Sequence, residues 1–156
     1  MSPCIMEVKI IEARPRNDGT VDRTAPCTFC RIVAGDLPAH RIYADDRAIG
    51  FLDINPATAG HALVVPRAHV ADIHDIDPDD LAACTVAAQT LARRIAGRMG
   101  ADGVNLLNSA GAAAWQSVFH FHLHVVPRYV GDALREPWRR LPGQAAELAA
   151  LARKLG

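Results

Sequence analysis

Three histidines at alternate positions are the part of this sequence best suited to chemistry. They are His120, His122 and His124, and Phe121 and Leu123 separate them. Side chains of a β-strand alternate between its two faces, so the three imidazoles would share one face, about 6.5–7 Å apart at about 3.3 Å of rise per residue. A face of this kind can serve one phosphate, one proton relay or one metal ion.

Chance is a poor explanation for this triplet, although a single strand histidine is usually structural. The chain has seven histidines in 156 residues. Scattered at random, they would form such an alternating run only about 1% of the time. A cluster of imidazoles is also costly to bury unless its nitrogens are used. We therefore interpret the triplet as functional.

A C-x-x-C pair, Cys27 and Cys30, is the second chemical signal. The spacing alone is compatible with metal binding, with a redox pair and with two buried thiols. No export signal is evident at the start of the sequence, which favours reduced thiols and a cytoplasmic protein. A structural zinc site normally needs four thiolate or imidazole ligands in a tetrahedron.

Composition narrows the class of protein. A chain of 156 residues can form one domain with a hydrophobic core. Its 17 basic and 17 acidic residues balance, which argues against the basic surface of a general nucleic-acid binder. The longest apolar run is too short to span a membrane. We expect neither a nucleic-acid polymer nor a membrane as partner.

The clearest predicted element is a helix over residues 78–99. Asp77 provides its N-cap, Pro78 its first position and Gly100 its stop. Apolar residues recur at three- and four-residue steps and give it one buried stripe. A short helix is predicted over residues 29–34, ending at Gly35, and a last one over about 143–155.

Five runs with strand character surround the long helix. They cover residues 40–44, 48–53, 61–65, 104–107 and 119–126. One long helix over a mostly antiparallel sheet of about five strands defines an α+β fold. We divide the chain into a partly disordered tail at 1–25 with a short strand near 8–11, a domain at 26–130, and a C-terminal extension at 131–156.

The motif residues also carry a resemblance to a known family. The triplet, followed by Val125-Val126 and preceded by Gln116-Ser117-Val118, resembles the signature of the histidine-triad (HIT) family of nucleotide hydrolases and transferases. Weaker matches follow the family's order upstream: Phe29-Cys30-Arg31-Ile32, Phe51-Leu52-Asp53-Ile54, Gly60-His61 and Pro66-Arg67-Ala68-His69. The resemblance spans about residues 26–130 and implies a HIT-like fold, a homodimer with a continuous sheet and a nucleotide on the sheet face.

The resemblance implies a covalent reaction at His122. This residue would attack the α-phosphorus of a purine nucleotide derivative, either a phosphoramidate or a dinucleoside polyphosphate, and water would then cleave the histidyl-nucleotidate. His124 would contact the phosphate or the leaving group as a proton donor. Gln116 and Ser117 would orient the phosphate, and Asn108 matches a family residue near it.

Nucleoside contacts are implied in the same way. Asp53 would hold ribose hydroxyls, and the base pocket would comprise Phe29, Ile32, Phe51 and Ile54. Judged from the residues alone, Asp53 could equally be a strand-end cap, and the apolar residues could equally be core.

The implied metal ligands resemble those of some bacterial HIT proteins, which pair such cysteines with two histidines. Carried over, the ligands are Cys27, Cys30, His69 and His120, holding one structural zinc per chain. His120 would then be a ligand that positions the neighbouring nucleophile and not a catalyst. His61 is interpreted either as a relay or hydrogen-bond partner or as a packed strand histidine.

Two other functions fit the same residues. The three triplet histidines, or two of them with His69, could hold a catalytic metal with no covalent intermediate. The chain could also be a nucleotide sensor that retains His122 without turnover. One departure from the family pattern bears on substrate size, because Trp115 stands where a glycine usually precedes Gln116-Ser117.

Overall fold

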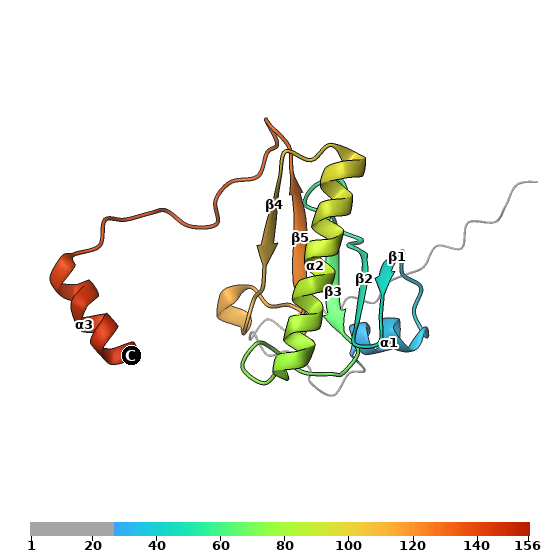
Figure 1. Ribbon diagram of the computed structural model, residues 1–156, viewed down its shortest axis with the longest axis horizontal. Helices are drawn as coiled ribbons and strands as arrows, with labels where there is room; N and C mark the ends of the chain where they lie inside the picture. Colours follow the sequence, from blue (N-terminus) through green and yellow to red (C-terminus); the bar gives the residue numbers. More distant parts are fainter. Residues whose placement is uncertain (1–26) are drawn as a thin grey trace, which may run out of the picture.

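A five-stranded antiparallel sheet forms the centre of the computed structural model, which describes residues 27–156 (Figure 1). Its strands are β1 (Arg41–Ala44), β2 (Ala48–Leu52), β3 (Ala62–Pro66), β4 (Gly103–Leu107) and β5 (Leu123–Arg128). They lie in the order β1-β2-β3-β5-β4, and every neighbouring pair is antiparallel. The predicted α+β fold class is confirmed. The predicted N-terminal strand and tail lie outside the described residues.

The long helix α2 (Pro78–Met99) covers one face of the sheet, as Figure 1 shows. It has the predicted bounds because its end signals are local. The Asp77 side chain accepts a hydrogen bond from the Asp79 backbone N–H, and Gly100 closes the helix in the left-handed conformation. Its buried stripe packs against the sheet through Cys84, Ala87, Ala88, Leu91 and Ile95.

The other face of the sheet carries the short helix α1 (Thr28–Ala34). Alternation along β2 divides the strand between two cores: Ala48 packs on the α2 side, whereas Ile49 and Phe51 pack with Phe29 and Ile32 of α1. Strand β3 divides in the same way. The α1 side of the sheet is therefore the side that carries Phe29.

Strand β5 begins at Leu123 and not at residue 119, so the predicted start of this strand is wrong. Extending the β3–β5 register by two pairs would set Phe121 opposite Pro66. Proline has no N–H for the ladder. The Phe121 N–H instead donates to the backbone carbonyl of Val70, at 2.7 Å. His120 and His122 consequently lie just before the regular strand. The alternation is kept, since Phe121 packs in the core on the α2 side.

Close packing of α2 on β2 depends on Gly50. A methyl group at this position would lie 2.8 Å from Leu91 Cδ1 and 3.1 Å from Tyr43 Cβ. We expect Gly50→Ala to lower the free energy of unfolding by about 1–3 kcal/mol through overpacking, as measured by urea titration. Gly97→Ala is the matched control, since Gly97 in α2 has no atom within 4 Å of such a methyl. An equal loss in both variants would contradict this account.

The C-terminal extension leaves the sheet after β5 and ends in the amphipathic helix α3 (Ala145–Leu155). Figure 1 shows this helix standing apart from the sheet, and none of its residues is buried. Among residues 27–156, no helix has both the length and the apolar character needed to cross a lipid bilayer.

Candidate functional site

All three triplet histidines lie on the α1 side of the sheet. The ring of Phe29 contacts two of them edge-on, with centroid distances of 5.9 Å to His120 and 5.3 Å to His122. The rings of His122 and His124 are 4.9 Å apart. The structure therefore brings together the three imidazoles that the alternating pattern placed on one face.

The tautomer of His122 follows from its one backbone contact. Its Nδ1 lies 2.8 Å from the carbonyl oxygen of His120. A carbonyl can only accept, so Nδ1 carries the proton and the neutral ring keeps its lone pair on Nε2. Burial lowers the pKa of His122, which favours this neutral form. Asn108 holds the same segment, since its Nδ2 donates to the His122 carbonyl at 2.9 Å.

A second pair of histidines is fixed in the same manner. The backbone N–H of Ala57 donates to His61 Nδ1 at 3.0 Å, so the proton of the neutral His61 ring is on Nε2. That atom lies 3.0 Å from His124 Nδ1, which must accept. Because Nδ1 of the neutral His124 ring accepts, its proton is on Nε2. The prediction that His61 is a hydrogen-bond partner is confirmed.

Electrostatics favour the neutral forms of this pair in the free protein. Burial lowers the pKa of His124 to about 4, helped by the neighbouring His122 and His61. Burial also lowers the pKa of His61, against the attraction of the Asp53 carboxylate. Asp53 Oδ2 lies 3.7 Å from His61 Nε2, and Oδ1 accepts from the Asn55 N–H at 2.8 Å. Asp53 therefore serves as a turn cap beside the histidines.

The Gln116-Ser117 pair divides between the interior and the surface. The Gln116 side chain is 4% exposed. Its Nε2 donates to the carbonyls of Ala71 (2.6 Å) and Val118 (3.2 Å), and its Oε1 accepts from the Gly111 N–H (2.7 Å). Gln116 thus shapes the loop between β4 and β5, whereas Ser117 is exposed and available to a ligand. That both residues orient a phosphate stays a prediction.

The four predicted metal ligands converge from three parts of the chain. Cys27 and Cys30 flank the first turn of α1, His69 follows β3, and His120 precedes β5. The ligand atoms of the four side chains all lie within 4.8 Å of one another. Burial raises the pKa of Cys30 to about 11, and the hydrogen bond and charge of the Cys27 thiol add to this effect. A nearby cation would lower the pKa of Cys30 and so favour the thiolate form that binds metal.

The distances in this cluster fit a tetrahedral zinc ion. Metal–sulfur bonds of about 2.3 Å and metal–nitrogen bonds of about 2.0–2.1 Å require N···N of about 3.3 Å and S···N of about 3.6 Å. His69 Nδ1 and His120 Nδ1 are 3.3 Å apart. Three sulfur–nitrogen distances are 3.2, 3.5 and 3.5 Å. His120 Nε2 donates to the Pro66 carbonyl at 3.0 Å, which leaves Nδ1 unprotonated toward the cluster.

Three of the four residues predicted for the base pocket lie in the core on the α1 side of the sheet. Phe29, Ile32 and Phe51 are buried in the α1 core, whereas Ile54 is exposed. Sequence reasoning missed two backbone partners of the histidine rings, the Pro66 carbonyl that accepts from His120 and the Ala57 N–H that donates to His61. Pro66 ends β3 and Ala57 lies in the loop before this strand, and no local sequence pattern predicts either contact.

Comparison with known proteins agrees with this geometry. A family model described as the HIT domain matches residues 34–131. Protein hit of Bacillus subtilis is 39% identical over 114 residues, covering 72% of this chain and 79% of the relative. The chain belongs to the histidine-triad family.

Two further relatives carry more specific descriptions. The adenylylsulfatase HINT3 of Arabidopsis thaliana is 32% identical over 146 residues, covering 88% of this chain and 74% of the relative. A crystal structure described as a zinc-bound histidine triad family protein of Mycobacterium smegmatis is 44% identical with a TM-score of 0.68. It covers 82% of this chain and 96% of that one.

Proposed function

We propose that the chain is a nucleotide hydrolase or nucleotidyl transferase that attacks the α-phosphate of a purine nucleotide derivative through a covalent histidyl-nucleotidate on His122. Phosphoramidates and dinucleoside polyphosphates are the substrate classes. The observation that carries this proposal is the hydrogen bond from His122 Nδ1 to the His120 carbonyl, because it leaves the lone pair of the neutral ring on Nε2. A neutral imidazole is a competent nucleophile near pH 7.

The reaction takes two displacements. First, His122 Nε2 bonds to the α-phosphorus, and the bond from phosphorus to the leaving group breaks with its electron pair on that group. An anionic phosphate beside His61 and His124 raises the pKa of this pair, so it binds a proton with the substrate and passes one from His124 Nε2 to the leaving group. Water then attacks phosphorus, returns a proton to the pair and releases His122.

The nucleoside half is assigned to the α1 side of the triplet. Phe51 and Phe29 pack edge-on at 5.6 Å beside the histidines, and the base is assigned to the apolar surface that these largely buried rings support. Ile32 and Ile54 extend that wall, and Asp53 is placed to accept from ribose hydroxyls. Ser117, with the loop that Gln116 and Asn108 hold, supplies hydrogen-bond donors to the phosphate.

A structural zinc ion is proposed at Cys27, Cys30, His69 and His120. The tetrahedral spacing of their ligand atoms supports it, as does the protonated Nε2 of His120. When bound, zinc supplies a rigid cross-link between α1 and the residues before β5. Because His120 also accepts the hydrogen bond from His122, the ligand set orients the nucleophile through the backbone.

One observation favours a second candidate function, a metal-dependent hydrolase. Asp53, His61 and His124 form another group with metal-ligand atoms within 4.8 Å of one another. Such a trio could hold a catalytic metal with open positions. Removal of metal would then stop turnover at once, without a covalent adduct on His122.

A homodimer is also proposed, with the sheets of two copies joined along β4. This strand is at one edge of the sheet, and its Leu106 and Leu107 are 46% and 41% exposed. An open edge with exposed leucines is a surface that a second copy can cover.

The function is tested with adenosine and guanosine phosphoramidates and diadenosine polyphosphates, assayed for release of the nucleoside monophosphate. Quenching with denaturant at alkaline pH during turnover, followed by peptide mass spectrometry, should identify an acid-labile nucleotidyl group on the peptide that contains His122. Turnover without any adduct favours the metal-dependent hydrolase. Tight binding without turnover favours a nucleotide sensor.

A further inference from the structure

A cavity lies on the face of the sheet opposite the histidines. It has a volume of about 450 Å³ and lies between the C-terminal half of α2 and the strands β1 and β2. Ile42 and Leu52 line it from the sheet, and Leu91, Ile95 and Met99 line it from the helix. Both its volume and its largely apolar wall are typical of sites for small molecules.

Strand β1 departs from regular pairing beside this cavity. The register between β1 and β2 shifts between Arg41 and Tyr43, as it does at a β-bulge. Two successive side chains, Ile42 and Tyr43, consequently pack against the core on the α2 side of the sheet, whereas regular alternation would send one of them to the other face. The irregularity therefore directs Ile42 toward the cavity.

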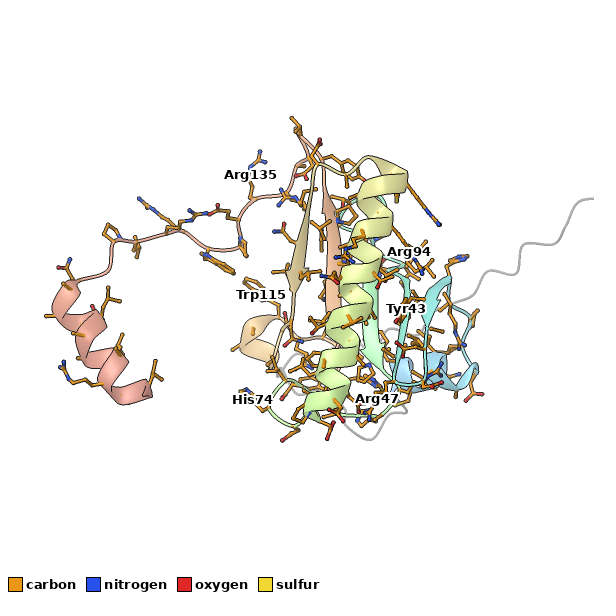
Figure 2. The ribbon with its side chains drawn as sticks, in the orientation of Figure 1. Tyr43, Arg47, His74, Arg94, Trp115 and Arg135 are labelled. Carbon is orange, nitrogen blue, oxygen red and sulfur yellow. The ribbon has the colours of Figure 1, made fainter. Side chains whose placement is uncertain are left out.

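Two arginines of α2, Arg94 and Arg98, line the same cavity. They are four residues apart and so lie on one side of the helix. Arg94 Nη1 donates to the Ile42 carbonyl at 2.9 Å, and the guanidinium carbon lies 5.9 Å from the centre of the Tyr43 ring. Figure 2 shows Arg94 of α2 close to Tyr43 of β1. These contacts hold the Arg94 guanidinium on the β1 side of the cavity.

The second arginine, Arg98, has no partner of this kind. It makes no hydrogen bond and no ion pair with any residue in the range 27–156. The acidic residues of α2 are Asp79 and Asp80 in its first turn. At about 1.5 Å of rise per residue, they lie about 20 Å or more from Arg94 along the helix. Strands β1 and β2 contain no acidic residue.

The acidic residues that follow these three elements are engaged elsewhere. Asp45, Asp53 and Asp102 each accept hydrogen bonds from backbone N–H groups. Within the part of the chain that the structure describes, none of them forms an ion pair with Arg94 or Arg98. The cavity therefore combines an apolar wall with positive charge that no ion pair neutralises.

We propose that this cavity binds a small anion with an aliphatic body, of the class of medium-chain carboxylates. The carboxylate accepts charge-assisted hydrogen bonds from Arg98 and from the Arg94 N–H groups that are not bound to Ile42. The aliphatic chain lies along the apolar wall, which contains no aromatic side chain on which a base could stack. The inference concerns a site separate from the histidines and does not depend on the proposed nucleotide chemistry.

The test is a calorimetric titration of the full-length chain with decanoate, and with acetate as the probe that keeps only the charge. Decanoate should bind with a Kd below about 1 mM, and acetate should show no binding in this range. Arg98→Gln should raise the Kd for decanoate about tenfold through loss of a charge-assisted hydrogen bond. Arg93→Gln is the matched control and should leave the Kd unchanged, because Arg93 is exposed on α2 but does not line the cavity.

Methyl NMR of ¹³C-labelled methionine shows where decanoate binds. Met99 lines the cavity, so its methyl signal, identified by Met99→Leu, should shift with decanoate and not with acetate. A Met99 signal that decanoate leaves in place, or equal Kd values for wild type and Arg98→Gln, would overturn the proposal. It would also be overturned by a Met99 signal that depends on protein concentration and not on decanoate, which would assign the cavity to contact with a second copy. Arginine side chains that only cover apolar surface would give no decanoate binding at all.

Discussion

Replacing His122 with alanine should lower kcat/KM by several powers of ten and abolish the covalent adduct. Loss of a nucleophile removes the whole two-step route, and the effects of such residues typically reach this size. The side chain makes edge contacts with Phe29 and His124 and one hydrogen bond to the His120 carbonyl, and none of these contacts links separate elements as a metal ligand would. Rates should be measured on phosphoramidate substrates, with the adduct followed by mass spectrometry and folding by circular dichroism.

Controls can separate the nucleophile from its neighbours. His74→Ala removes an exposed histidine outside both clusters and should leave the rate unchanged. His124→Ala should cost less with a good leaving group than with an amine, because only the amine needs the proton. An activity above about one hundredth of wild type in His122→Ala would contradict the covalent mechanism.

The elements that the sequence predicts best are those with local end signals. Helix α2 begins and ends where Asp77, Pro78 and Gly100 predict. Strand β5 starts later than expected because Pro66, on β3, has no N–H that could donate to Phe121 in the ladder. That interruption depends on the register between strands distant in sequence, which no local pattern specifies.

The candidate site shows the same division between features that a local pattern predicts and features that depend on distant segments. Alternation alone placed the three histidines on one face, but the meeting of Cys27 and Cys30 with His69 and His120 came only from the family resemblance. Spacing within one segment cannot specify that residues 27, 69 and 120 converge. The tautomers of His61 and His122 were also beyond the sequence, because backbone groups of Ala57 and His120 fix them.

Removal of the metal should have the largest effect on stability. The proposed ligands would join α1 to His69 and His120, so a bound zinc ion would close a loop of more than ninety residues. Metal bound only to the folded state adds its affinity to the free energy of unfolding, and structural zinc typically contributes several kcal/mol or more. Each kcal/mol shifts the melting temperature of a domain of this size by about 2–4 °C. Chelation should therefore lower it by about 10 °C or more.

Substitution of the ligands should reproduce the effect of chelation. Cys27→Ser, Cys30→Ser and His120→Ala should each lose most of the one zinc per chain expected from elemental analysis and melt at similarly reduced temperatures. Cys84→Ala is the matched control, because Cys84 is a free cysteine on the buried face of α2 and lies outside the cluster. It should retain the metal even if the smaller side chain costs some stability. No zinc in protein purified without chelator would contradict the site.

The time course of chelation distinguishes the structural site from the catalytic one. A zinc ion with four protein ligands has no open position for water, so its loss should reduce activity only as the fold around His122 loosens. Turnover should then decline in parallel with the melting transition, and readdition of zinc should restore both. Immediate loss of turnover with an unchanged melting curve would instead assign the metal to Asp53, His61 and His124. In that case His120→Ala should retain its activity, whereas a structural site requires it to behave like the cysteine variants.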